Sequence, residues 1–83
     1  MNLDFTNHAR HMLAQRGILP VWVERALSAP ELRQPDPDDP AVERFYRRIP
    51  EFGGRVLRVA ANTQVEPWRV VSVFFDRNMK GRL

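Results

Sequence analysis

Thr6–Ile18, with the sequence TNHARHMLAQRGI, is the stretch around which we expect the chain to fold. Thr6 suits the position before a first helical turn, because its hydroxyl can accept a hydrogen bond from a backbone N–H that the helix leaves unpaired. Gly17 suits the end of the helix, since glycine readily takes the left-handed conformation that closes many helices. The stretch therefore predicts one helix over residues 6–16, with the apolar Ile18 folding back beside it.

Apolar side chains line one side of this expected helix. At about 100° per residue they fall on a single stripe, which must be buried in the folded chain: Phe5, Ala9, Met12 and Leu13. His8 lies at the margin of the stripe, and Arg16 lies in the last turn, where a cation suits the negative end of the helix dipole. Both side chains are thus placed to face the rim of a following sheet.

The rest of the chain predicts a second helix and a sheet. Pro20 suits the first turn of a helix over residues 20–28, which Pro30 ends because the residue before a proline is pushed out of the helical region. After a loop rich in proline and aspartate, apolar and polar residues alternate as they do in strands. The expected strands are residues 31–34, 42–49, 55–62 and 68–76, followed by a basic tail at residues 77–83.

The short connections between the last three strands force antiparallel pairing of neighbours. We therefore expect an α+β fold, with residues 1–83 forming a single domain of two N-terminal helices packed on a three- to four-stranded antiparallel sheet. The other face of the sheet is expected to carry Tyr46, Arg48 and Arg58, with Asp76 near its end. The residues expected in the core on the helix side are Phe45, Ile49, Leu57, Val59, Val71 and Val73.

The composition favours an anionic partner. The net charge is +3, and of the thirteen basic residues twelve are arginine and only Lys80 is lysine. The planar fork of arginine matches phosphate oxygens two at a time, which lysine cannot do. Residues 55–83 hold six positive and two negative side chains, so the basic charge is concentrated in the second half. A coding bias toward arginine is the alternative explanation, and composition alone leaves it open.

Several classes of function are excluded or disfavoured. The chain has no cysteine, so disulfides, a thiol nucleophile and a cysteine metal site are impossible. His8 and His11 have no third ligand at a suitable spacing, so we expect no metal and no cofactor. No apolar run is long enough to span a membrane, and Met1–Phe5 lacks the pattern of a signal peptide. We expect a cytoplasmic protein without a membrane partner.

Four short motifs occur in an order and spacing that cover nearly the whole chain: His8–Ala9, Arg16–Ile18, Arg55–Val59 and Val70–Arg77. In these motifs the chain resembles the small bacterial domain family DUF4258, a family related to the BrnT and RelE toxins of toxin–antitoxin systems. The resemblance implies a RelE-like fold and the activity of a metal-independent ribonuclease. It also implies RNA as the substrate and a cognate antitoxin protein as the partner.

Cleavage of this kind begins with attack by the 2′-hydroxyl of the RNA. It needs a base for the hydroxyl proton, cations that stabilise the phosphorane, and an acid for the leaving 5′-oxygen. His8 is the first candidate for proton transfer, because histidine exchanges protons near neutral pH; Asp76 is the second, and Arg58 is expected to stabilise the phosphorane. The residues expected to bind RNA or its phosphates are Arg16, Arg48, Tyr46, Arg77 and Lys80.

Two other functions stay open on the sequence. The first is a non-catalytic module that binds RNA or phosphate on the same basic face. The second is a protein-interaction domain that docks a partner chain or another copy on a strand edge near Glu31, or on an apolar patch at residues 70–74. The candidate residues also have purely structural alternatives: His8 can be bonded within the fold, and Arg48 and Arg58 can form surface ion pairs.

Overall fold

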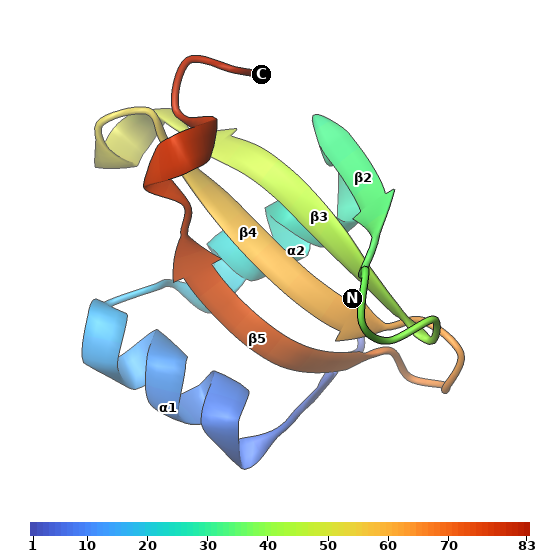
Figure 1. The fold of residues 1–83 in the computed structure, drawn as a ribbon. Helices are drawn as coiled ribbons and strands as arrows, with labels where there is room; N and C mark the ends of the chain where they lie inside the picture. The colour runs from blue at the N-terminus through green and yellow to red at the C-terminus, as the bar shows by residue number, and fades with distance from the viewer.

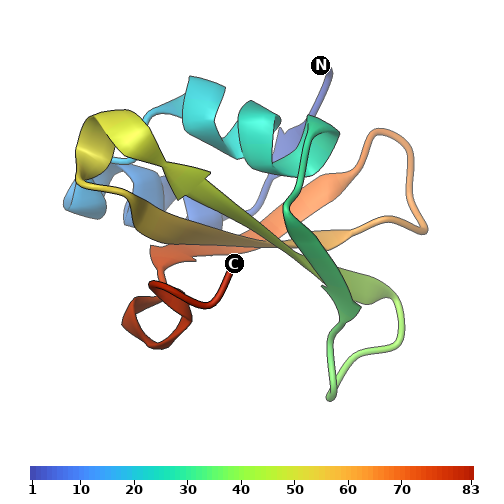
Figure 2. The ribbon, with the colours of Figure 1, turned by 90° about the horizontal axis from the view of Figure 1, so that it is seen from above.

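A computed structural model describes all 83 residues and places two helices on one face of a five-stranded sheet (Figures 1 and 2). The helices are α1, Asn7–Arg16, and α2, Pro20–Ser28. The strands are β1, Asp4–Phe5, β2, Leu32–Pro35, β3, Val42–Ile49, β4, Arg55–Asn62, and β5, Arg69–Phe75. Two short 3₁₀ turns complete the chain: η1, Pro50–Phe52, connects β3 to β4, and η2, Arg77–Met79, follows β5.

The strands lie in the order β1-β5-β4-β3-β2. The predicted α+β fold is confirmed, and β2 to β5 pair antiparallel with their neighbours. The prediction of a three- to four-stranded antiparallel sheet is wrong, because β1 adds a fifth strand parallel to β5. The sequence gives no sign of β1, because two residues are too few to show the alternation of a strand. Its partner is also distant, since Asp4 pairs with Arg69, 65 residues further along the chain.

Thr6 caps the N-terminus of α1, as the sequence predicts, and also ties the helix to the sheet. Its Oγ1 accepts a hydrogen bond from the Ala9 N–H at 3.1 Å and donates one to the Val71 carbonyl at 3.4 Å. The Thr6 N–H donates to the Val70 carbonyl at 3.0 Å. At the other end Gly17 closes the helix with a φ of 63°. These contacts fix α1 against β5 and determine where its last turn lies.

Five of the six residues predicted for the core are fully buried beneath the helices: Phe45, Ile49, Leu57, Val59 and Val73. Val71 was predicted wrongly, since it is only half-buried and Val70 lies in the core instead. The cause is a β-bulge: Ala60 pairs with Ser72 but Ala61 pairs with Val70, which leaves Val71 without a partner. A bulge breaks the alternation of a strand, so Val70 and Val73 both face the helices.

The opposite face of the sheet holds buried residues of its own: Val42, Tyr46, Val56 and Ala60. Tyr46, Arg58 and Phe74 are cross-strand neighbours there, and the Arg58 guanidinium lies 4.3 Å from the centre of the Phe74 ring. Figure 2 shows η2 on this side of the sheet, across from the helices. The predicted basic tail is thus folded where it begins, and the Asp76 carboxylate caps η2 by accepting from the Asn78 N–H at 3.0 Å.

We predict that Thr6→Ala lowers the free energy of unfolding by about 1 kcal/mol, the usual contribution of a helix N-cap. Thr6→Ser is the control, because a serine hydroxyl can accept the same bond from Ala9. Denaturant unfolding followed by circular dichroism measures both variants. Equal midpoints for wild type and Thr6→Ala would show that the cap contributes nothing.

Candidate functional site

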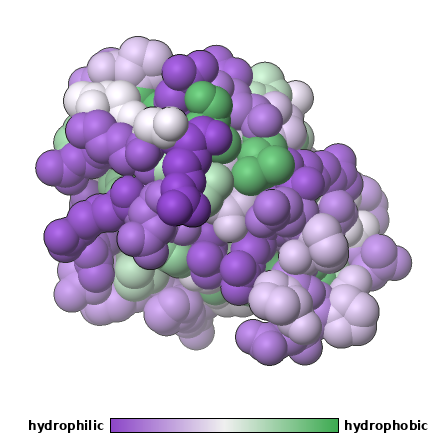
Figure 3. All heavy atoms as spheres, turned by 45° about the horizontal axis from the view of Figure 1, so that its top comes forward, coloured by the Kyte–Doolittle hydropathy of each residue, from purple (hydrophilic) through white to green (hydrophobic).

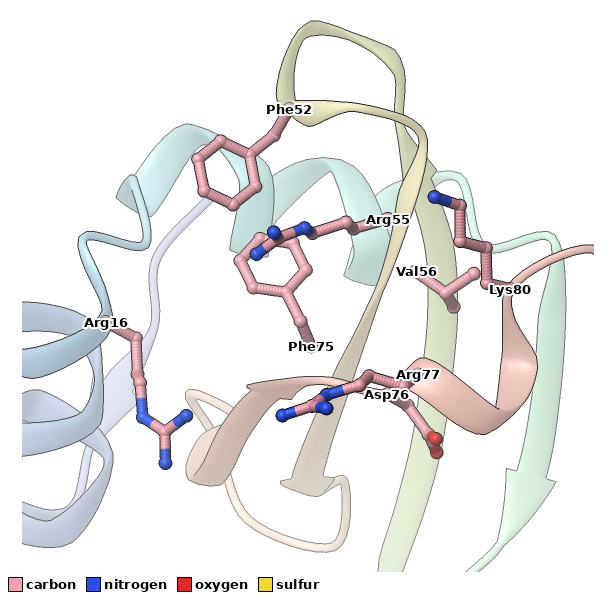
Figure 4. A pocket seen from close by; sticks show the side chains of 8 residues that line it. All are labelled: Arg16, Phe52, Arg55, Val56, Phe75, Asp76, Arg77 and Lys80. Atoms are coloured by element: carbon pink, nitrogen blue, oxygen red, sulfur yellow. The ribbon is translucent and has the colours of Figure 1, made fainter.

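A pocket of about 450 Å³ opens at the end of the sheet where β4 begins and β5 ends (Figure 4). Its volume falls within the range of roughly 300–1,000 Å³ that is usual for ligand sites. The end of α1, the turn η1, the start of β4 and the segment from the end of β5 through η2 all contribute to it. The lining residues are Arg16, Phe52, Arg55, Val56, Phe75, Asp76, Arg77 and Lys80.

The antiparallel register brings these segments together. Leu57 pairs with Phe75, so the first residues of β4 lie beside the last residues of β5. The Asp76 N–H extends this ladder by donating to the Val56 carbonyl at 2.8 Å. Gly53 and Gly54, with φ values of 69° and 68°, turn the chain from η1 into β4. The pocket therefore follows from strand pairing and one tight connection.

Four side chains in the lining are cationic, and none of them forms an ion pair with a carboxylate: Arg16, Arg55, Arg77 and Lys80. The only carboxylate of the lining belongs to Asp76, which lies 3.9 Å from Arg58 on the outer face of the sheet. Figure 4 shows the Asp76 carboxylate turned away from the three guanidinium groups of the lining. The pocket therefore presents positive charge that the protein does not neutralise.

Elsewhere the fold neutralises its arginines. Seven of the twelve form ion pairs with carboxylates: Arg25, Arg33, Arg44, Arg47, Arg48, Arg58 and Arg69. Hydrogen bonds from Arg33 and Thr63 hold the pKa of Glu43 at about 2, which illustrates how tightly one such pair is made. Of the six basic side chains left without a carboxylate, four line the pocket, and Arg10 and Arg82 do not.

The carboxylates without a cationic partner lie at the far end of the sheet. Asp38 and Asp39 are in the loop before β3, and Glu66 is in the loop between β4 and β5 (Figure 1). The Thr63 N–H donates to the Ala41 carbonyl at 3.2 Å and holds these two loops together. The molecule is therefore electrically polar along its strands, and such a field draws anions toward the pocket.

Four of the predicted site residues meet in this pocket, namely Arg16, Asp76, Arg77 and Lys80, but His8 does not join them. His8 is exposed near the start of α1, about 12 Å along the helix axis from Arg16 at the usual rise per residue. Arg48 is also apart, since its side chain holds the Glu31 carboxylate at 2.7 Å.

Two further predicted residues lie on the outer face of the sheet. Tyr46 is only 3% exposed, so its ring is not accessible to a base. Arg58 is half-buried between Phe74 and Asp76, and it reaches the pocket only through its ion pair with Asp76. These positions favour a structural role for both side chains.

The sequence reasoning missed Phe52 and Arg55. Phe52 belongs to the connection between β3 and β4, which the sequence identifies only as a turn, and Arg55 is the first residue of the predicted strand 55–62. The signal was available, because antiparallel pairing of residues 55–62 with residues 68–76 sets Arg55 near the predicted ligand Arg77. The expected register would thus have added a third guanidinium to the site.

Other kinds of site find less support. No three histidine, aspartate or glutamate side chains are grouped to hold a metal ion, and neither helix has the length and apolarity to cross a membrane. Residues 70–74 do not offer the apolar patch that would favour a protein-interaction domain, because Val70 is buried and Arg58 covers Phe74. In Figure 3, where the top of Figure 1 is turned toward the viewer, most of the visible atoms belong to hydrophilic residues. β2 is one of the two edge strands of the sheet, and its outer edge is one that a partner chain could extend.

A protein-family model described as "Domain of unknown function (DUF4258)" matches residues 5–75. The match spans both helices and β2 to β5, and it confirms the resemblance predicted from the short motifs. Asp76, Arg77 and Lys80 lie beyond it. No curated protein and no solved structure matches the chain.

We predict that stability decreases in acid through the pair of Arg25 with Glu51, which joins α2 to the turn carrying Phe52. Two hydrogen bonds of 2.8 Å lower the pKa of Glu51 from 4.5 to about 2. Because the pKa is lower in the folded chain, the stabilisation is complete above pH 4.5 and is lost as the pH falls toward 2. Glu51→Gln should therefore weaken the pH dependence of the melting temperature in this interval.

Glu66→Gln is the matched control for this experiment, since Glu66 is exposed and forms no ion pair. It should leave the pH dependence unchanged. An identical slope for wild type and Glu51→Gln would mean that the pair does not contribute to stability.

Proposed function

Because the chain belongs to the DUF4258 family, whose function is unknown, we propose a function from the pocket itself: the domain binds RNA through the phosphate backbone. One observation carries the proposal. Four of the six basic side chains that lack a carboxylate partner gather on a single pocket, although the fold pairs most of its other arginines.

Phosphate is the anion that this set of donors suits best. Arg16, Arg55 and Arg77 each offer a planar fork that can bind two phosphate oxygens at once. Lys80 adds a fourth positive charge. The carboxylates at the opposite end of the molecule would repel the backbone there, so an approaching polyanion is oriented with the pocket facing it. A binding site of this kind requires no metal.

Cleavage of the bound RNA is the second candidate function, and it is supported by the relation to BrnT and RelE toxins that the resemblance to DUF4258 implies. The domain would then be the toxin of a toxin–antitoxin pair, with an antitoxin protein as its partner. The 2′-hydroxyl would attack the adjacent phosphorus, forming a 2′,3′-cyclic phosphate and releasing a 5′-hydroxyl. The guanidinium groups of the pocket would stabilise the phosphorane. Asp76 would take the 2′-hydroxyl proton after turning from Arg58 into the pocket, and the Lys80 ammonium would donate the proton that the leaving 5′-oxygen takes up. His8 lies outside the pocket and takes no part in this reaction.

We predict that Arg77→Gln weakens RNA binding and makes it less sensitive to salt. Each phosphate contact that is lost should reduce the slope of log K against log salt by about 0.7 for a single strand. Arg10→Gln is the matched control, because Arg10 is also exposed and without a carboxylate but lies outside the pocket. Fluorescence anisotropy with 2′-O-methyl RNA, which cannot undergo this cleavage, measures binding alone. Equal losses in both variants would mean that RNA binds diffusely.

We predict for the second candidate that expression in bacteria slows growth and leaves RNA fragments with 5′-hydroxyl ends, with chelators having no effect on the purified activity. The double variant Arg55→Gln with Arg77→Gln should abolish both effects, whereas His8→Ala should retain them. Normal growth and intact RNA on expression of the wild type would disprove cleavage and leave the binding proposal standing.

A further inference from the structure

One wall of the pocket is aromatic. The rings of Phe52 and Phe75 are stacked, with centroids 5.0 Å apart and planes 23° from parallel. The buried Trp22 supports both from behind, with centroids 5.3 Å from Phe52 and 6.1 Å from Phe75. Phe52 and Phe75 are both only half-buried and line the pocket. They therefore form a rigid apolar platform beside the cations.

Arg55 lies across this platform. Its guanidinium is 5.0 Å from the centre of the Phe52 ring, and it has no carboxylate partner. The side chain is exposed at the first residue of β4 and forms neither a hydrogen bond nor an ion pair, so its contact with the ring can open for a ligand. A flat, polarisable group could insert beside it, because both a phenyl ring and a guanidinium plane are surfaces on which nucleobases stack.

We propose that an unpaired nucleobase enters the pocket between the Phe52 ring and the Arg55 guanidinium, which moves off the ring to admit it, and that the domain therefore selects single-stranded RNA. The inference rests on the proposed binding of RNA at this pocket. Figure 4 shows Phe52 on one side of the pocket and the guanidinium groups of Arg16 and Arg77 on the other. This separation matches a nucleotide, which has an aromatic base at one end and a phosphate at the other.

Duplex RNA cannot use such a site in the same way. Its bases are stacked on their neighbours inside the helix, so only phosphates and sugars would meet the pocket. Stacking is also tolerant of base identity, because every base has a π-face. The site should therefore discriminate strongly by strandedness and weakly by sequence.

The test compares three short 2′-O-methyl oligoribonucleotides with the wild-type protein: a single strand of mixed sequence, the same strand in a duplex, and the same strand with abasic positions. The single strand should bind tighter than the abasic strand by about 5- to 150-fold, the range for stacking of one base. Phe52→Leu keeps the apolar bulk but removes the π-face, and it should bring single-strand affinity down to that of the abasic strand. Phe52→Trp should retain the preference, and quenching of a 2-aminopurine base reports stacking directly.

Each outcome decides the proposal. Equal affinity of the wild type for the intact and abasic strands would overturn base stacking, while the cationic pocket could still be the site of RNA binding. Failure to bind any of the three oligonucleotides would overturn the proposed function and this inference together. The comparison among ligands uses the unaltered protein, so a folding defect in Phe52→Leu cannot obscure it.

Discussion

The antiparallel pairing of β4 with β5 is the constraint on which the rest of the structure depends. Its register sets Leu57 opposite Phe75 and Val59 opposite Val73, which gives the helices one continuous apolar face to cover. A slip of one residue would turn that face toward solvent. The bulge at Val71 lies toward the far end of the ladder, so the pairing next to the pocket stays regular. Core and pocket thus share one cause.

Most of the fold could be predicted because its signals are local. The cap at Thr6, the stop at Gly17 and the alternation of β3 and β4 are each encoded within a few neighbouring residues, and the structure has them where they were expected. The two errors are of the opposite kind. β1 exists only because β5 is beside it, and the bulge at Val71 arises in the pairing of two strands. Neither can be read from one stretch of sequence.

Half of the predicted site residues line the pocket, and the division again follows from which signals are local in the sequence. Arg16, Arg77 and Lys80 stood out as cations at the ends of elements, and the ends of elements are what the topology brings together. His8 was chosen for its chemistry, but side chains in the first turn of α1 point away from the end where the pocket lies. Which arginines are free is also invisible in the sequence, because pairs such as Arg48 with Glu31 join residues of different strands and loops. Composition counts charges, whereas folding decides which of them remain available to a ligand.

The pocket combines residues from the beginning and the end of the chain, and this affects when it can form during synthesis on the ribosome. The pocket needs Arg16 from the first helix and Lys80 from the turn after the last strand, and α1 itself docks on β5. Contacts between segments so distant in sequence form only after both are present, and they form slowly. A chain still in synthesis has neither a docked first helix nor a gathered set of cations. The pocket therefore cannot form until translation has passed β5 and the turn η2 that follows it.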